Sequence, residues 1–152
     1  MPDVHDRETR SRNMSAIRGR DTKPERVLRS ALHRAGYRFR LNARLPGKPD
    51  LTFRKYRATV FVHGCFWHMH DCPRFKQPRG ENAAFWQEKL ARNARRDKEV
   101  SDALREAGWR QLVVWECALS GTGRIELSEI VAKVGAWLAS DAEAAEIAGT
   151  FD

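Results

Sequence analysis

The sequence predicts an α/β fold in which a mixed central sheet is flanked by helices. Short apolar runs typical of strands alternate with longer segments whose apolar residues recur at helical spacing. A long helical segment also separates two of the predicted strands, and such a crossover permits parallel pairing between them. At 152 residues the chain is long enough to bury one substantial core.

The first predicted helix runs from Thr22 to Gly36. Thr22 and Glu25 have the spacing of a capping box, and Pro24 between them suits the first helical turn. Gly36 suits the left-handed position that commonly follows a helix. The apolar stripe expected to face the core consists of Val27, Leu28, Ala31, Leu32 and Ala35.

The other elements follow from apolar spacing and from glycine and proline signals. Strands are expected at residues 37–41, 50–54, 58–62 and 109–115, and helices at residues 82–107 and 125–138. Gly108 follows the long helix and is expected to end it. The residues of the last helix expected to face inward are Leu127, Ile130, Val131, Val134 and Leu138.

The predicted strands at residues 50–54 and 58–62 are expected to form a hairpin, but the sequence does not determine its register. Asp50 lies opposite Val62 if the hairpin is centred on Tyr56, and opposite His63 if the turn is Tyr56-Arg57. A slip of one residue exchanges the two faces of a strand, so the two registers are not equivalent. In both, a carboxylate and strand-end groups converge at one edge of the sheet.

Composition divides the chain into three parts. Residues 1–20 are polar, rich in arginine and without periodicity, which predicts a basic N-terminal arm. Residues 21–139 contain the predicted elements and form one domain. Residues 140–152 are mostly small and acidic, and they are expected to fray as a C-terminal tail.

The positive charge is concentrated in the first half of the chain. The formal net charge is +8, and residues 1–80 hold 19 Lys and Arg against 7 Asp and Glu. One surface that faces a polyanion would explain this asymmetry, and the preference for arginine favours contacts to phosphates and base edges. A solvated surface explains the charge equally well, so charge alone does not decide for nucleic acid.

The sequence predicts a reduced cytoplasmic protein without a membrane segment. Its N-terminus lacks the apolar stretch of a signal peptide, and no apolar run approaches the length that spans a bilayer. The three cysteines are odd in number, which does not suit a complete set of disulfides. Their thiols are therefore expected to serve another purpose.

Metal ligands concentrate after the third predicted strand. Cys65, His70 and Cys72 lie close together in the sequence, and Cys117 ends the strand at residues 109–115. Three thiolates and an imidazole form a closed set that suits a structural zinc ion. Burial as ordinary small thiols is the alternative, but the loop offers little apolar surface for it.

Groups suited to hydrolytic chemistry lie nearby in the predicted fold. Asp50 with carbonyl and water oxygens is typical of a magnesium site, although Pro-Asp before a strand also occurs in ordinary turns. If His70 binds zinc, His63 and His68 remain free, either as a general base or as loop residues that hydrogen-bond phosphate or backbone. Asn93 and Asp97 interrupt the apolar stripe of the long helix, and they face either a polar site or solvent.

Adjacent aromatic residues lie between the expected metal ligands. Phe66 and Trp67 stand side by side on this loop, where burial of both rings is not expected. In a basic protein such a pair could insert as a wedge between base pairs, which costs least at a mismatch. The alternative is a pair of core aromatics.

At these residues the sequence resembles the bacterial very-short-patch mismatch repair endonucleases, over nearly its whole length. The carrying stretches are Thr9-Arg10-Ser11-Arg12-Asn13-Met14, Asp21-Thr22 with Glu25, Leu45-Pro46-Gly47-Lys48-Pro49-Asp50, His63-Gly64-Cys65-Phe66-Trp67-His68, Phe85-Trp86 with Asn93 and Asp97, and Gly108-Trp109-Arg110 through Trp115-Glu116-Cys117-Ala118-Leu119. Together these motifs are highly specific.

The resemblance implies a restriction-endonuclease-like fold with a degenerate catalytic core. Asp50 corresponds to the first carboxylate of that core, and the main-chain carbonyl of Val62 replaces the second as a ligand for Mg²⁺. The family often has threonine at the position of Val62, so a role for a hydroxyl stays open. Met69 and Asp71 interrupt what can be a longer run of histidines.

The resemblance also implies roles for individual residues. His68 corresponds to the general base, assisted by Asp97, and His63 handles the scissile phosphate. Glu25 would contact the metal cluster through water. The residues implied to contact DNA are Phe66, Trp67 and Trp86 from the major groove, Met14 of the DNA-binding arm from the minor groove, and Asn93 beside them.

The implied substrate is duplex DNA with a T:G mismatch left by deamination of 5-methylcytosine. The implied reaction is a single-strand nick 5′ to the mispaired thymine, for which a monomer suffices. MutL, a repair polymerase and a ligase are partners by resemblance alone. The alternative is a related restriction-type nuclease that acts on paired or differently mismatched DNA.

Overall fold

The computed structural model describes residues 22–151, so the predicted arm with Met14 lies outside the described residues. Four strands form one mixed sheet in the order β1 (Leu51–Phe53), β2 (Ala58–His63), β3 (Arg110–Trp115) and β4 (Ala144–Ile147). β1 is antiparallel to β2, whereas β3 is parallel to both β2 and β4. The predicted α/β class and mixed sheet are confirmed.

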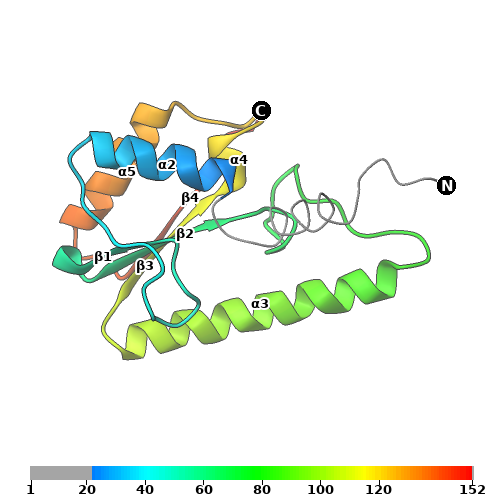
Figure 1. The fold of residues 1–152 in the computed structure, drawn as a ribbon. Helices are drawn as coiled ribbons and strands as arrows, with labels where there is room; N and C mark the ends of the chain where they lie inside the picture. The colour runs from blue at the N-terminus through cyan, green and yellow to red at the C-terminus, as the bar shows by residue number, and fades with distance from the viewer. Residues whose placement is uncertain (1–21, 152) are drawn as a thin grey trace, which may run out of the picture.

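Helices cover both faces of this sheet (Figure 1). α2 (Lys23–Arg34) and α5 (Leu127–Ala139) pack together on one face, and the short α4 (Glu116–Leu119) follows β3 directly. The long helix α3 (Ala83–Glu106) runs along the other face and makes the crossover between β2 and β3. No helix in residues 22–151 is long and apolar enough to cross a membrane.

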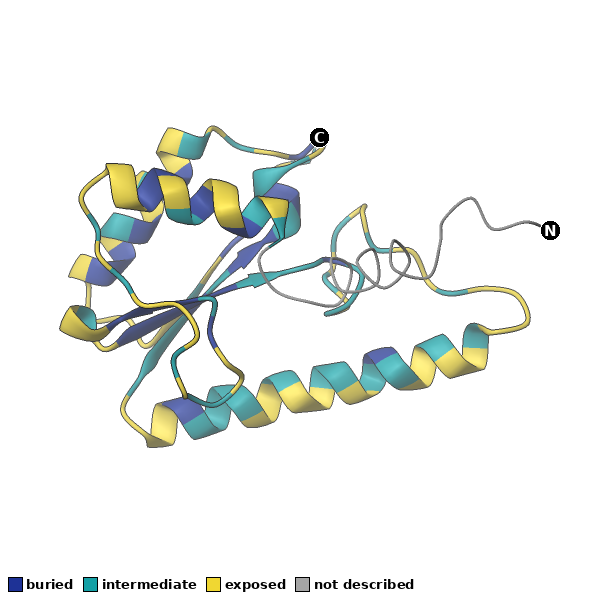
Figure 2. Cartoon of the chain, viewed as in Figure 1, coloured by how far each residue is buried: buried dark blue, intermediate teal, exposed yellow. Residues whose placement is uncertain are grey.

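The main core lies between the sheet and the pair α2 and α5, where the ribbon is darkest (Figure 2). Its members include Leu28, Leu32, Phe53, Val60, Leu112, Val114, Ile130, Val134 and Leu138. A separate small cluster of Cys65, Trp115 and Cys117 lies at the carboxyl end of β3. The main core therefore forms the scaffold of the fold, and the small cluster lies in a separate region at the carboxyl end of β3.

α2 begins as its sequence predicts. The side chain of Thr22 accepts a hydrogen bond from the Glu25 N–H at 3.4 Å, with proline in the first turn. The predicted stripe is wrong at its edges, because Val27 is 36% exposed and Ala35 lies past the helix end on the surface. Glu25 is buried instead, on the side of the helix that faces the candidate site.

The prediction of a strand at residues 37–41 is wrong. Only Arg40 pairs with the sheet, through an isolated antiparallel bridge to Thr52. The preceding aromatic side chains pack on Phe53 instead, with ring centroids 6.4 Å away for Tyr37 and 5.6 Å for Phe39. Asn42 then turns the chain with a positive φ of 58°, so pairing stops after one residue.

Both predicted hairpin registers are wrong by a small shift. Phe53 pairs with Ala58 and Leu51 with Val60, so the same register carried one step further places Asp50 across from Phe61. The shift arises because the chain reverses through a 3-10 turn at Arg54–Tyr56, with Arg57 in the left-handed region. Convergence at one sheet edge survives, since Asp50 still reaches the backbone of β2.

The expected fraying from residue 140 is also wrong. β4 extends the sheet beside β3, in register from Gln111 opposite Ala144 to Val114 opposite Ile147. Ile147 is 7% exposed and joins the main core. The pattern AAEI is too short and too weakly apolar to signal a strand alone, and β4 depends on the exposed edge of β3.

Candidate active site

A groove of about 870 Å³ lies between α3 and the end of β2. The start of α2 and the turn at Gly47 and Lys48 complete its wall. Gly47 has a φ of 74°, and a Cβ there would lie 2.5 Å from the Cγ1 of Val100 on α3. Only glycine therefore permits this turn to approach α3 so closely, which brings the residues before β1 to the groove.

Asp50 lies where this turn meets the sheet. Its Oδ2 accepts a hydrogen bond from the Val62 N–H at 2.6 Å, and both residues line the groove with His63. The carboxylate is therefore fixed beside the carboxyl end of β2. A carboxylate and main-chain oxygens at one position are the kind of ligands that Mg²⁺ accepts.

His63 and His68 form a stacked pair in the same groove. Their ring centroids are 3.7 Å apart and their planes differ by 3°. Burial, followed by the charge of His68, lowers the pKa of His63 to about 3. His63 is therefore neutral near pH 7, and it can donate a hydrogen bond without bringing a charge.

Asp97 on α3 orients His68. The Nδ1 of His68 lies 2.7 Å from the Oδ2 of Asp97. Because a carboxylate only accepts hydrogen bonds, the Nδ1 carries the proton and the Nε2 of the neutral ring keeps its lone pair. This arrangement has the geometry of an oriented general base.

A strained residue separates two neighbouring histidines. Met69 adopts a left-handed φ of 51°, a backbone conformation that few residues other than glycine favour. The amides on either side are held by the loop itself, with His68 N–H donating to Gly64 and His70 N–H to Cys65. The turn at Met69 lets His68 reach Asp97 while His70 joins the cysteines.

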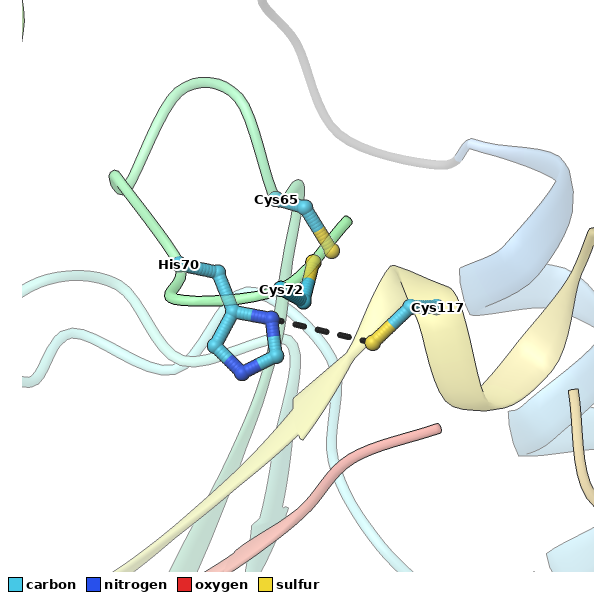
Figure 3. A group of neighbouring side chains, drawn as sticks. All are labelled: Cys65, His70, Cys72 and Cys117. Atoms are coloured by element: carbon cyan, nitrogen blue, oxygen red, sulfur yellow. Dashed lines mark hydrogen bonds between the residues drawn. The ribbon is translucent and has the colours of Figure 1, made fainter. Parts of the chain in front are cut away.

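The four predicted soft ligands converge on one point (Figure 3). The ligand atoms of Cys65, His70, Cys72 and Cys117 all lie within 4.8 Å of one another, and the His70 Nδ1 is 3.7 Å from the Cys117 Sγ. A tetrahedral zinc ion with Zn–S bonds of about 2.3 Å holds its ligand atoms roughly 3.8 Å apart. The cluster could therefore hold a metal ion, and three thiolates with one imidazole are a donor set that suits zinc.

The surroundings of these sulfurs also suit a cation. Burial raises the pKa of the Cys65 thiol to about 12, so this sulfur becomes a thiolate only where a cation compensates. The Gly149 N–H donates to the Cys117 Sγ at 3.2 Å, as backbone amides do around metal-bound thiolates. Arg74 closes the loop against α4 through the Ser120 carbonyl at 2.9 Å and Glu116 at 3.5 Å.

Three aromatic residues gather beside the groove. Phe66, Trp67 and Trp86 lie with ring centroids between 5.3 and 6.2 Å apart, although they come from the loop and from α3. None of the three is fully buried, and Phe66 and Trp67 line the groove. The sequence predicted that Phe66 and Trp67 stay accessible, and this is confirmed.

α3 holds this aromatic group in place. The Asn93 side-chain amide donates to the Trp67 carbonyl at 3.1 Å. The Lys89 ammonium lies 5.6 Å from the ring centroids of both Trp67 and Trp86. Sequence reasoning missed Lys89, although its spacing of three from Trp86 and four from Asn93 places it on the same helical stripe.

The groove thus brings most of the predicted site residues together. Those that line it are Glu25, Asp50, Val62, His63, Phe66, Trp67, His68, Asn93 and Asp97. The soft-metal cluster of Cys65, His70, Cys72 and Cys117 adjoins the groove. Three of these ligands lie on the same loop as Phe66, Trp67 and His68, which line the groove. Met14 falls outside the described residues.

Comparisons with known proteins identify a matching family and several relatives of this chain. Residues 2–74 match the family model described as DNA mismatch endonuclease Vsr. The chain is 44% identical over 148 residues to DNA mismatch endonuclease Vsr of Escherichia coli (strain K12), covering 97% of this chain and 94% of that protein. It is 46% identical over 114 residues to the type II nicking enzyme V.XorIIP of Xanthomonas oryzae pv. oryzae, covering 74% of this chain and 83% of that protein.

A third relative is the type II nicking enzyme V.NmeAIP of Neisseria meningitidis serogroup A. It is 38% identical over 137 residues, covering 88% of this chain and 97% of that protein. The chain belongs to the Vsr family of DNA mismatch endonucleases.

Proposed function

We propose that the protein is a Mg²⁺-dependent endonuclease that nicks duplex DNA 5′ to the thymine of a T:G mismatch. The observation that carries the proposal is one groove that holds Asp50, an oriented His68 and an accessible aromatic group. Relatives named as mismatch endonuclease and nicking enzymes support it. The mixed sheet with Asp50 at its edge is consistent with a restriction-endonuclease-like core.

The residues around Asp50 suit hydrolysis of a phosphodiester. The Asp50 carboxylate and the Val62 carbonyl would hold Mg²⁺, which when bound stabilises charge on the phosphate and activates water. The Nε2 of His68 would take a proton from the attacking water, with Asp97 maintaining the required tautomer. Neutral His63 would donate a hydrogen bond to the scissile phosphate, and Glu25 would bind water at the metal.

The aromatic group suits recognition by deformation. Thymine and guanine are both normal bases, so no unusual atom marks this lesion. A wobble pair is displaced and less well stacked, so a wedge of Phe66, Trp67 and Trp86 opens it at lower cost than a paired step. Lys89 would add a positive charge at the same place, because it lies against two of the rings.

The cysteine cluster serves a structural role in this proposal. A zinc ion at Cys65, His70, Cys72 and Cys117 would join residues 64–72, the catalytic loop, to α4 and offset the entropy of ordering this loop. The basic residues 1–20, with Met14, would act as a DNA-binding arm on a monomer in the cytoplasm. MutL, a repair polymerase and a ligase are the partners expected downstream.

The test is nicking of end-labelled duplexes with Mg²⁺, each strand labelled in turn. We expect the T:G duplex to be cut in the thymine strand alone, and the C:G duplex to be cut at least about a hundredfold more slowly. Asp50→Ala should lose the activity, because it removes the carboxylate that the Val62 N–H holds at the end of β2. Equal cutting of both duplexes would favour the related restriction-type nuclease, and an active Asp50→Ala variant would reject the site.

A further inference from the structure

Trp115 stands between the soft-metal cluster and the histidine pair. His70 stacks on its indole, with ring centroids 3.9 Å apart and planes 8° from parallel. The rings of His63 and His68 meet the same indole at 71° and 70°, with centroids 5.4 and 6.4 Å away. One side chain therefore contacts the candidate metal ligand and both histidines of the groove.

The indole is itself fixed by β4. Its Nε1–H donates to the Oε1 of Glu146 at 2.7 Å, which is a short hydrogen bond to a charged acceptor. Trp115 is 7% exposed, whereas Glu146 is exposed on the edge strand. The orientation of a buried ring thus depends on a surface carboxylate 31 residues later in the chain.

We propose that Trp115 and Glu146 are positioning residues, whose hydrogen bond holds the indole that aligns His63 and His68. The inference deepens the nuclease function proposed above and rests on it. Neither residue touches the reacting atoms, since both act through the imidazole rings. β4 thereby becomes part of the machinery of the groove and not only an edge of the sheet.

Loss of the hydrogen bond affects alignment more than folding. Without its acceptor, the indole N–H is buried and unsatisfied, and the ring gains from turning toward water. The aromatic contacts to both histidines are then lost or shifted. A general base displaced by about 1 Å can lower a rate by about a hundredfold, whereas an exposed glutamate contributes little to stability.

The charge of Glu146 offers a competing explanation. Burial lowers the pKa of His70, and the Glu146 carboxylate acts in the opposite direction. Glu146→Gln separates the two roles, since an amide oxygen accepts the indole N–H but carries no charge. Trp115→Phe removes the donor and keeps a ring at the same place.

The experiment compares these variants in the zinc-loaded protein with the T:G duplex. We expect Glu146→Ala to lower the nicking rate at saturating enzyme by about tenfold, with an unchanged Kd for the duplex and unchanged zinc content. Glu146→Gln should restore most of the rate. Glu143→Ala is the matched control, because Glu143 is an exposed glutamate of the same segment and the Trp115 N–H donates to Glu146 instead.

A double-mutant cycle tests whether the two residues act through one contact. Adding Glu146→Ala to Trp115→Phe should lower the rate no further than Trp115→Phe alone, because the hydrogen bond is already absent. Additive losses would overturn the proposal. So would a Glu146→Gln variant as slow as Glu146→Ala, or a Glu146→Ala variant as fast as Glu143→Ala.

A second measurement does not depend on nicking. Long-range ¹H–¹⁵N spectra of the imidazoles in DNA-free, zinc-loaded protein should show shifted His63 and His68 signals in Glu146→Ala, and wild-type signals in Glu146→Gln. Unchanged signals in Glu146→Ala would overturn the positioning role even in a fully active enzyme. If the wild type nicks no duplex, the proposed function fails while these spectra still decide whether Trp115 and Glu146 align the histidines.

Discussion

At the scale of single residues, one hydrogen bond determines which nitrogen of His68 is available. Asp97 holds the Nδ1 at 2.7 Å, so the Nε2 is left as the acceptor. Both residues are partly exposed, with side-chain exposures of 24% and 34%, so the Coulombic attraction is screened by solvent. The contribution of Asp97 is therefore orientation and choice of tautomer more than charge.

Asp97→Asn should separate tautomer from packing. The amide has the same shape, but its NH₂ can donate to the Nδ1 and shift the proton to the Nε2, which removes the base. We expect the single-turnover nicking rate to fall by about 10² to 10⁴, with little change in duplex affinity. Asp102→Asn is the control, because Asp102 lies on the same helix and forms an exposed ion pair with Arg105. Equal rates for the two variants would contradict this role of Asp97.

At the scale of elements, one arginine joins three parts of the fold. The Arg110 guanidinium donates to the carbonyls of Trp137 and Leu138 at the end of α5 and to Tyr56 in the hairpin turn, at 3.0 to 3.1 Å. It also lies 4.6 Å from the centroid of the Trp137 ring. The contacts orient α5 against β3 and fix the point where the chain enters β4.

Arg110→Lys should lower the free energy of unfolding by about 2 to 4 kcal/mol, because an ammonium cannot reproduce a planar fork that serves several carbonyls. Urea unfolding followed by circular dichroism measures the change. Arg105→Lys provides the matched control, since the exposed Arg105–Asp102 pair should contribute less than about 1 kcal/mol. If the two substitutions cost the same, the carbonyl contacts of Arg110 do not stabilise the junction.

The elements also show where sequence reasoning succeeds. α2 was predictable because its signals are local: a capping threonine, a proline in the first turn and a glycine after the end. β4 was not predictable, because its pairing is determined by the free edge of β3 and not by its own residues. The hairpin register failed for a similar reason, since a 3-10 turn shifted the pairing without any marker in the sequence.

The site divides in the same way. Cys65, His70 and Cys72 could be grouped because their chemistry restricts them to few purposes, and Cys117 completed the set. No pattern in the sequence indicates the contact between Trp115 and Glu146, because a tryptophan in an apolar strand is predicted to be an ordinary core residue. Its role depends on packing between segments that are distant in the sequence.

At the scale of the whole molecule, stability and site formation depend on different cores. The main cluster between the sheet, α2 and α5 contains no residue of the catalytic loop. That loop is anchored instead by the small cluster of Cys65, Trp115 and Cys117, with Cys72 packed against it. A scaffold of this kind can remain folded while the loop that carries Phe66, Trp67 and His68 loses its order.

Removal of zinc should reveal this division. After dialysis against a strong chelator, we expect the helical far-ultraviolet signal to remain within about a fifth of its value, because the main core contains none of the four zinc ligands. With Mg²⁺ supplied again for the assay, the near-ultraviolet signal of Trp67 and Trp115 and the nicking of T:G duplexes should both be lost, and added zinc should restore both. Depletion of Mg²⁺ alone is the control, and it should abolish nicking with no change in either spectrum. Cooperative unfolding of the whole chain on chelation would show that the metal stabilises the scaffold as well. Full activity in zinc-free protein would show that the active site does not need the zinc ion.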